Sequence, residues 1–362
     1  MAEEPPAAEQ AQCQPCEDGP DSGAGPGPST AAAAAAASLT KMEDMPTVAI
    51  VIGMAGSGKT SLMQRINAYR HAKDKPPYII NLDPACTNLP YEANVDIRDT
   101  VDYKNVMKEY NLGPNGGILT ASNLFATRFD QVVNLCEKRA KDVDYIMVDT
   151  PGQIEIFTWS ASGAIVTESF ASTFPTCVLF VVDTPRAQNP QAFMSNMLQA
   201  VSILYKTRLP LIIVFNKIDV VRHETMLGWM EDFDKFHAVI DENSTFASDL
   251  SRSLSLVLDE FYKNLRVAGV SAMTGEGMEG LFDTIGRARK EYLDEYLPEL
   301  KEKKAARAKE DEARRLASLE QLHKDMREGG GRGEKVVMDM NNKTQEEETA
   351  VDSDDDDEYT DA

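Results

Sequence analysis

The segment Gly53–Thr60 constrains the fold of this chain more than any other, because it reads Gly-Met-Ala-Gly-Ser-Gly-Lys-Thr. This sequence matches the spacing G-x4-G-K-[ST], and it lies between an apolar run of strand length and a helical pattern. A glycine-rich turn in that context wraps a phosphate with its backbone N–H groups, and the helix N-terminus adds a positive dipole. We therefore expect a phosphate-binding loop of the P-loop NTPase type rather than a structural glycine turn.

The polar groups of this loop have separate expected tasks. Lys59 would reach the β- and γ-phosphates of a nucleoside triphosphate, and the Thr60 hydroxyl would bind Mg²⁺. The other contacts would come mainly from backbone N–H groups of the turn. The residues expected to bind the nucleotide here are Gly53, Ala55, Gly56, Ser57, Gly58, Lys59, Thr60 and Ser61.

From Thr47 onward, apolar runs of strand length alternate with helical patterns. The runs are apolar nearly throughout, as expected for strands that are buried on both faces of a parallel sheet. The runs cover 47–53, 78–82, 145–149, 177–183, 211–215 and 267–271, and the helical patterns include 123–141, 191–206 and 279–296. This order predicts an α/β fold with a doubly wound, mainly parallel sheet.

Composition divides the chain into four parts. Residues 1–46 are rich in Ala, Pro and acidic residues, and we expect them to be disordered. A nucleotide-binding domain is predicted over 47–297, with a helical insertion at about 224–265. A charged helix is predicted over 298–328, and a disordered acidic tail is predicted over 329–362.

The charge of the chain is concentrated at its ends. The net charge is −22; residues 1–46 hold 8 acidic and 1 basic residue, and residues 345–362 hold 10 acidic residues and no basic one. Binding to nucleic acid or to anionic lipid needs clustered cations, so we expect neither a direct nucleic-acid partner nor a membrane partner.

The apolar runs are far shorter than the roughly 20 residues of a membrane span, and no basic region opens a signal peptide. We expect the protein in the cytosol or the nucleus.

A second motif follows the run 145–149 and reads Asp149-Thr-Pro-Gly152-Gln153. A carboxylate at the carboxyl end of a strand beside a phosphate loop is placed to hold Mg²⁺, so Asp149 is a predicted metal ligand. Gly152 offers a backbone N–H that can approach the γ-phosphate. Gln153 stands at the spacing that orients the attacking water in Ras-like enzymes, because an amide can accept from water and donate to a phosphoryl oxygen.

A third motif predicts which base the site accepts. Asn216-Lys217-Ile-Asp219 follows the run 211–215, and the Asp219 carboxylate can accept from both N1–H and the N2 amino group of guanine. Adenine has an acceptor at N1, so its lone pair would face the carboxylate. Ser271 and Ala272 follow the last strand and fit a backbone contact to guanine O6. The predicted ligands are therefore GTP and GDP.

These motifs, together with two further segments, resemble the GPN-loop GTPase family. Gly113-Pro114-Asn115 lies between the second apolar run and Asp149, and Asn81-Leu-Asp-Pro-Ala85 ends that second run. With the phosphate loop and the Asp149 motif, the resemblance extends over about 47–296. The stretches 125–131, 157–163 and 196–205 are similar to the member of that family associated with RNA polymerase II assembly.

The resemblance implies site roles that spacing does not. The family belongs to the SIMIBI class of P-loop proteins, which work as nucleotide-gated dimers. Asp83 would be the switch I acid near Mg²⁺, and Asn115 would reach across the dimer to the γ-phosphate of the partner's nucleotide. Gly113 and Pro114 would shape that loop. Spacing alone indicates a plain turn at Gly113–Asn115, because this tripeptide is common in turns.

The resemblance also implies a function. We expect a GTP-hydrolysing switch that acts as an assembly chaperone for RNA polymerase II subunits before nuclear import, in the cytoplasm and shuttling to the nucleus. Its partner would be a paralogous GPN-loop GTPase in a heterodimer, or a second copy of itself. A metal-insertion GTPase is one alternative, but the four His residues are scattered along the sequence and Cys86 stands alone near switch I. A scaffold with a structural nucleotide is another.

Overall fold

The computed structural model describes residues 41–232, 265–300 and 313–319, together with residues 235, 236, 238, 239, 261, 262, 302, 305, 306 and 309. The chain divides into two compact units, Met1–Lys301 and Glu302–Ala362. Within the described residues, no helix is long and apolar enough to cross a membrane.

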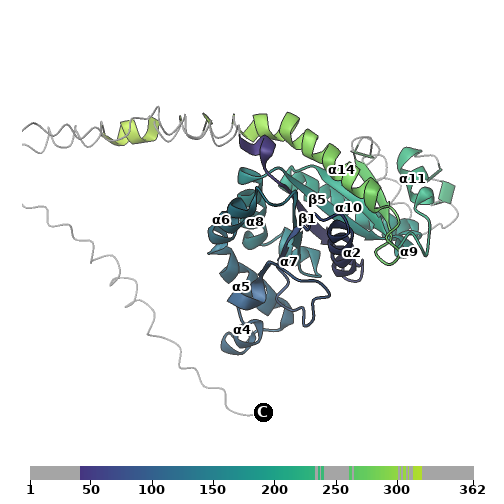
Figure 1. The fold of residues 1–362 in the computed structure, drawn as a ribbon, viewed down its shortest axis with the longest axis horizontal. Coiled ribbons are helices and arrows are strands. Elements are labelled where there is room, and N and C mark those ends of the chain that lie inside the picture. Colours follow the sequence, from purple (N-terminus) through teal and green to yellow (C-terminus); the bar gives the residue numbers. More distant parts are fainter. Residues whose placement is uncertain are drawn as a thin grey trace, which may run out of the picture. The chain divides into compact units, whose positions relative to one another are not determined.

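The first unit is built on a seven-stranded parallel sheet with the order β3-β2-β4-β1-β5-β6-β7 (Figure 1). The strands are β1 Thr47–Gly53, β2 Tyr78–Asn81, β3 Val95–Asp96, β4 Tyr145–Asp149, β5 Thr176–Asp183, β6 Leu211–Asn216 and β7 Arg266–Val270. The predicted doubly wound fold is confirmed, and each predicted strand agrees with an observed one to within a residue at either end. The two-residue strand β3 is the one strand of this sheet that was not predicted, because it does not lie in an apolar run.

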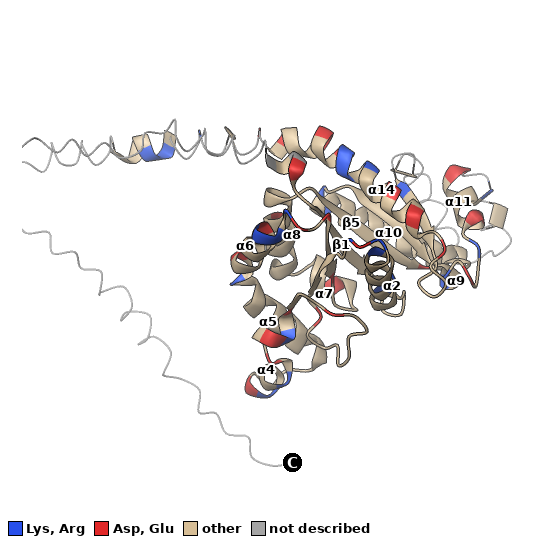
Figure 2. Ribbon diagram, viewed as in Figure 1, with Lys and Arg blue, Asp and Glu red and all other residues tan. Residues whose placement is uncertain are grey.

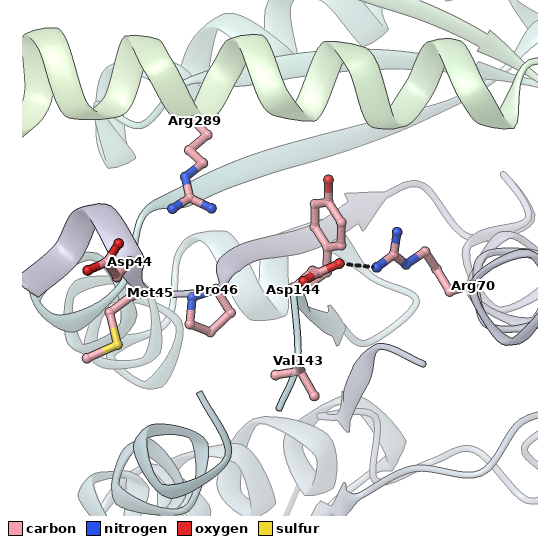
Figure 3. Close-up of a pocket in the computed structure, with 8 residues that line it drawn as sticks. Asp44, Met45, Pro46, Arg70, Val143, Asp144 and Arg289 are labelled. Carbon is pink, nitrogen blue, oxygen red and sulfur yellow. Dashed lines mark hydrogen bonds and ion pairs between the residues drawn. The ribbon is translucent and has the colours of Figure 1, made fainter. Parts of the chain in front are cut away.

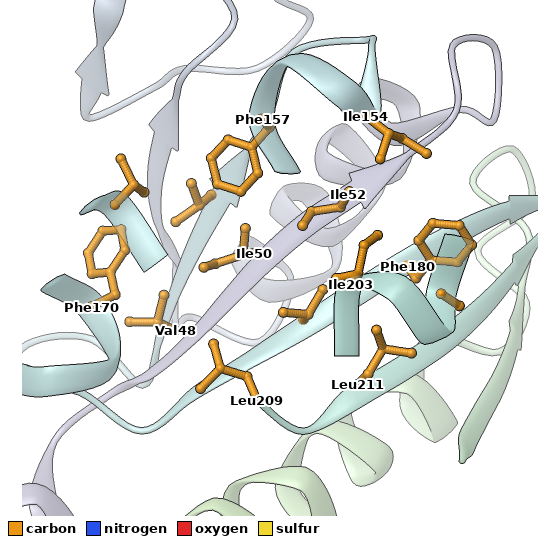
Figure 4. Close-up of a cluster of buried hydrophobic side chains, with 14 of the residues drawn as sticks. Val48, Ile50, Ile52, Ile154, Phe157, Phe170, Phe180, Ile203, Leu209 and Leu211 are labelled. Carbon is orange, nitrogen blue, oxygen red and sulfur yellow. The ribbon is translucent and has the colours of Figure 1, made fainter. Parts of the chain in front are cut away.

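The sheet is buried on both faces because its strands are apolar at nearly every position. In β1, Val48, Ile50 and Ile52 belong to one buried cluster, and Ala49 and Val51 belong to a second cluster on the other face. Figure 4 shows the first cluster, in which β1 meets side chains from the helices of that face. The continuous apolar runs therefore correctly predicted a parallel sheet that is covered on both faces.

Helices cover both faces. Helices α2 (Lys59–His71) and α14 (Met278–Glu291) supply buried residues to the second cluster. Every other helix that contributes residues to one of the two clusters contributes them to the first cluster. These other helices include α3 Ile97–Thr100, α4 Tyr103–Glu109, α5 Pro114–Ala126, α6 Phe129–Arg139, α7 Ile154–Thr158, α8 Ala161–Thr173, α9 Thr184–Ala187, α10 Pro190–Thr207 and α11 Glu224–Glu231. Acidic and basic residues are interspersed along α14, where Figure 2 shows both colours.

The predicted helices at 191–206 and 279–296 correspond to α10 and to α14 with the π-helical turn η2 (Tyr292–Tyr296). The single helix expected over 123–141 is wrong, because α5 ends at Ala126 and α6 begins at Phe129. The Thr127 hydroxyl donates to the Leu124 carbonyl at the break. Such a local side-chain bond competes with the helical backbone ladder.

Two other expectations need correction. Residues 41–46 were expected in the disordered N-terminal segment, but Lys41–Asp44 form the 3-10 helix η1 and Met42 is buried in the first cluster. The tripeptide Gly113–Asn115 is not a plain turn, because Gly113 is the N-cap and Pro114 the first residue of α5. Proline suits that position, since its missing N–H would have no partner there.

The remaining predicted segments are only partly described. The insertion predicted at about 224–265 begins with α11, and most of its remainder lies outside the described residues. In the predicted charged helix over 298–328, residues 313–319 are helical and exposed. Residues 1–40 and the predicted acidic tail over 329–362 lie outside the described residues.

Candidate nucleotide-binding site

The candidate site lies at the carboxyl end of β1. This strand pairs with β4 on one side and with β5 on the other. The chain forms the side that holds β2, β3 and β4 first, and it then crosses β1 to form the side that holds β5, β6 and β7. Ligands of open α/β sheets bind at such a topological switch point, outside the carboxyl ends of the strands. The loop predicted to bind phosphate leaves β1 at this point and leads into α2.

Two glycines of the loop are required by close contacts. Gly53 ends β1 beside β5, and a Cβ atom there would lie 2.5 Å from the Val181 carbonyl oxygen. Gly58 is the N-cap of α2 with a φ of 91°, and a Cβ atom there would lie 2.5 Å from the Asn216 amide nitrogen. A larger residue at either position would push the loop away from its supports.

Lys59 is buried inside the loop. Its Nζ donates to the carbonyl oxygens of Gly53, at 2.8 Å, and Met54, at 3.3 Å. Burial lowers the pKa of Lys59, while the nearby charges of Asp149 and Asp83 act to raise it. The predicted phosphate-binding cation thus interacts electrostatically with both predicted metal-binding carboxylates.

Asp149 ends β4 and is only 2% exposed. Its Oδ2 accepts a hydrogen bond from the Tyr91 hydroxyl at 2.6 Å, and its Oδ1 is buried without a hydrogen-bond partner. Burial raises the pKa of Asp149 to about 6. Burial also raises the pKa of Asp83, whose Oδ1 accepts from the Ala85 N–H.

A buried carboxylate oxygen without a partner suits a hard divalent cation or a water bound to it. With Asp83 and the Thr60 hydroxyl at the start of α2, Asp149 provides the type of oxygen ligands that Mg²⁺ accepts. Within the described part of the chain, no group of three or more His, Cys, Asp or Glu side chains is arranged to hold a metal ion.

The raised pKa of Asp149 predicts a pH-dependent cost to stability. An unfolded Asp titrates near pH 4, so between about pH 4 and pH 6 the folded protein binds more protons than the unfolded one, and stability falls as pH rises. Above pH 6, a pKa raised from near 4 to about 6 lowers the free energy of unfolding by roughly 3 kcal/mol. We expect Asp149→Asn, without nucleotide or metal, to be more stable than the wild type at pH 7.5, by up to that amount.

Chemical denaturation at pH 4.5 and at pH 7.5 would measure this difference. The advantage of Asp149→Asn should shrink toward zero at the lower pH. Asp130→Asn, at an exposed position on α6, controls for the loss of one negative charge. An advantage of equal size at both pH values would contradict the prediction.

The base-recognition motif is held against the phosphate loop. The Asn216 Nδ2 donates to the Ser57 carbonyl at 2.9 Å, and its Oδ1 accepts from the Ala272 N–H at 3.2 Å. The exposed Asp219 carboxylate accepts from the Ser271 hydroxyl at 2.6 Å. These bonds bring together the ends of β1, β6 and β7, so the predicted phosphate and base residues form one site.

Lys217 connects the two halves of the site. It has a φ of 70°, a left-handed conformation that costs a non-glycine residue about 1–3 kcal/mol. Its Nζ donates to the Gly56 carbonyl and to the Asp183 carboxylate, both at 2.9 Å. These contacts stabilise the strained conformation of Lys217, and they hold its side chain against the phosphate loop.

Sequence reasoning missed two residues near the site. Asp183 ends β5 next to Asn216 in the sheet register, and it also forms an ion pair with Arg186 at 3.3 Å. The sequence could have indicated Asp183 as a site residue, because it ends a strand, as Asp149 does. Tyr91 lies 58 residues from Asp149 in sequence, and no local pattern indicates their contact.

Gln153 and Asn115 contact each other within one chain. The Gln153 Nε2 donates to the Asn115 Oδ1 at 3.0 Å, and both side chains are at the amino ends of helices, α7 and α5. No hydrogen bond among the described residues joins either amide to the phosphate loop. Gly113 and Gly152 have open space where a Cβ atom would stand. The structure therefore brings the two predicted catalytic amides together but does not bond them to Lys59.

A separate pocket of about 260 Å³ lies at the opposite, amino end of the strands. It is lined by residues that directly precede β1 and β4, including Pro46 and Asp144, and by Arg289 of α14 (Figure 3). Arg70 donates to Asp144 there at 2.7 Å. None of the predicted nucleotide-site residues lines this pocket.

A parallel sheet with a phosphate loop after its central strand and Asn-Lys-x-Asp after β6 defines a P-loop GTPase domain. A family profile described as "Conserved hypothetical ATP binding protein" matches residues 51–291. "GPN-loop GTPase 1" of Schizosaccharomyces pombe is 52% identical, over 80% of this chain and 81% of the relative. The chain belongs to the GPN-loop GTPase family, and it is a GTPase by that membership.

Two more distant relatives extend this result. "GPN-loop GTPase 2" of Saccharomyces cerevisiae is 27% identical, over 67% of this chain and 73% of the relative. The solved structure of a GTPase from Pyrococcus abyssi, in apo form, has a TM-score of 0.60 and 26% identity, and it covers 68% of this chain and 98% of that one. The family resemblance and the fold class expected from sequence are thus confirmed.

Proposed function

We propose that this chain is a GTP-driven switch that acts as an assembly chaperone for RNA polymerase II before nuclear import. The observation that carries the switch is the linked site itself, in which Asn216 bonds both to the phosphate loop and to the loop of Ala272. These bonds support a coupling between recognition of the base and binding of the phosphates. The polymerase role is supported by the similarity of residues 125–131, 157–163 and 196–205 to the family member with that association.

In the proposed reaction, water attacks the γ-phosphorus of GTP, and the bond to the oxygen that bridges the β-phosphate breaks. The products are GDP and inorganic phosphate. Lys59 would turn from the carbonyls of the loop to the phosphoryl oxygens, where its charge stabilises the transition state. Thr60, Asp83 and Asp149 would hold Mg²⁺, which when bound neutralises charge on the phosphates.

The amide pair gives these roles a chemical basis. The bond from Gln153 to Asn115 uses one donor of Gln153 and the carbonyl oxygen of Asn115. It leaves the Gln153 Oε1 available to accept from an attacking water, and the Asn115 amide nitrogen available to donate to a phosphoryl oxygen. We propose that Gln153 orients the water and that Asn115 reaches the γ-phosphate of a partner subunit.

The proposed partner is a paralogous GPN-loop GTPase in a heterodimer, or a second copy of this chain. Saccharomyces cerevisiae has both a GPN-loop GTPase 1 and a GPN-loop GTPase 2 that are similar to this chain, which is compatible with pairing between paralogues. We propose that the protein is cytoplasmic and shuttles to the nucleus. Imaging of a tagged chain before and after a block of nuclear export tests this: accumulation in the nucleus is expected, and an unchanged distribution would contradict shuttling.

Gln153→Leu is expected to slow GTP hydrolysis by about 100-fold, because leucine cannot orient water or bond to Asn115. Affinity purification of wild-type and Gln153→Leu protein from cells, with mass spectrometry, then tests the proposed role. We expect a GPN-loop paralogue and polymerase subunits to copurify, in amounts that change with the variant. Gln131→Leu, at an exposed position on α6, is the matched control.

Either half of this prediction can fail separately. Unchanged turnover in Gln153→Leu would remove Gln153 from the mechanism. If neither a paralogue nor polymerase subunits copurify, the assembly role is wrong, although the GTPase domain remains. Equal amounts of partner with wild type and with Gln153→Leu would argue that the nucleotide state does not control the association.

A further inference from the structure

The proposed mechanism does not use Tyr91, the side chain that contacts Asp149 directly. Its hydroxyl donates to the Asp149 Oδ2 at 2.6 Å, a short distance typical of a hydroxyl bound to a carboxylate. The other carboxylate oxygen, Oδ1, is buried and has no hydrogen-bond partner. One oxygen of Asp149 is therefore occupied by the protein, and the other is left for a ligand.

The position of the Tyr91 ring is fixed by packing. The residue is 7% exposed, and it belongs to the same buried cluster as Leu62 and Met63 of α2, the helix that begins at the phosphate loop. A buried ring held against the core cannot turn away at low cost, so the direction of the hydroxyl is well determined. The bond thus holds the carboxylate from a rigid support.

Tyr91 also lies in the segment that carries Asp83, between β2 and β3. Hydrogen bonds hold this segment in place, because the Asp83 carboxylate accepts from the Ala85 N–H, and Arg98 of α3 donates to the carbonyls of Cys86 and Thr87. Tyr91 connects the segment to Asp149 by a direct hydrogen bond. A movement of the segment would therefore change the positions of both proposed metal-binding carboxylates.

We infer that Tyr91 is a positioning residue that orients Asp149 toward the divalent cation and couples the Asp83 segment to the cation site. This inference rests on the proposed Mg²⁺ site. A carboxylate anchored at Oδ2 cannot rotate freely, so Oδ1 stays directed at the cation. Hydrogen-bond partners of metal ligands typically change metal affinity by about 10- to 100-fold when they are removed.

Tyr91→Phe tests the inference, because it removes the hydroxyl and keeps the buried ring. With GDP bound, we expect the affinity for Mn²⁺, measured by electron paramagnetic resonance, to fall about 10-fold or more. The Mg²⁺ concentration that half-maximally slows the release of a fluorescent GDP should rise by the same factor. GDP release without divalent cation should stay close to that of the wild type.

Tyr292→Phe is the matched control. The Tyr292 hydroxyl is also buried and donates to a backbone carbonyl, that of Ala171, away from the site. Both variants lose one buried hydroxyl bond, and thermal unfolding checks that each of them remains folded. Only Tyr91→Phe should alter cation binding. If the two variants titrate alike, or if Tyr91→Phe weakens GDP binding equally with and without cation, the inference is overturned.

Asp149→Asn separates this inference from the proposal beneath it. If GDP release from the wild type does not respond to Mg²⁺, and Asp149→Asn behaves in the same way, the proposed cation site itself is wrong. If Asp149→Asn loses the response to Mg²⁺ while Tyr91→Phe keeps the full wild-type response, the cation site stands and the role of Tyr91 is refuted.

Discussion

Lys59→Ala is expected to reduce the affinity for GTP by about 100-fold or more. Each hydrogen bond from an ammonium to a phosphoryl oxygen is worth about 1.5–3 kcal/mol, and two such bonds account for a change of this size. The buried Nζ already lies within reach of the loop carbonyls of Gly53 and Met54, so a short rotation brings it to the phosphates. Calorimetric titration with GDP and with a non-hydrolysable GTP analogue measures the loss.

Lys108→Ala, at an exposed position on α4, is the control for removal of one cation. Thermal unfolding without nucleotide must show that Lys59→Ala is folded. Because Lys59 is expected to reach the γ-phosphate, the triphosphate analogue should lose more affinity than GDP. An affinity within a few-fold of the wild type would show that the phosphates are bound elsewhere.

Asp219→Asn is expected to reverse the preference for the base. Guanine would lose one or two charge-assisted hydrogen bonds of about 1.5–3 kcal/mol each, which corresponds to roughly 10- to 10⁴-fold in affinity. The variant amide can still accept from the Ser271 hydroxyl, so the loop should keep its shape. Xanthine carries a carbonyl where guanine carries its amino group, and the new amide can donate to it.

Competition of GTP, xanthosine triphosphate and ATP against a fluorescent nucleotide would measure this change. We expect the order of GTP and xanthosine triphosphate to be exchanged in Asp219→Asn, while the weak binding of ATP changes little. Asp130→Asn, which removes an exposed carboxylate on α6, is the control for the loss of one negative charge. A variant that keeps the wild-type preference for GTP would remove Asp219 from base recognition.

The strands were predictable because each is apolar along almost its whole length, which only a sheet covered on both faces explains. The two-residue β3 has no such pattern, since it is formed by two hydrogen-bonded partners of β2 and not by its own composition. The break between α5 and α6 escaped prediction for a related reason. Helical periodicity continues across residues 127 and 128, and a single hydroxyl bond accompanies the interruption.

The chemistry of the site was readable in the sequence because each motif is local. A phosphate loop, an acid at the end of a strand and Asn-Lys-x-Asp each need only a few neighbouring residues in one backbone conformation. The local motifs alone therefore predicted the nucleotide, the base and the role of Asp149 as a ligand of the proposed cation. Family resemblance was needed only for Asp83 and for the loop at Asn115.

The contacts between these motifs depend on the path of the chain. Tyr91 meets Asp149 across 58 residues, Gln153 meets Asn115 across 38, and Asn216 meets Ser57 across 159. Such pairs exist because parallel strands bring their carboxyl ends to one edge of the sheet in an order unlike that of the sequence. A local pattern holds no information about that order, so the partner of each buried polar group became known only from the folded arrangement.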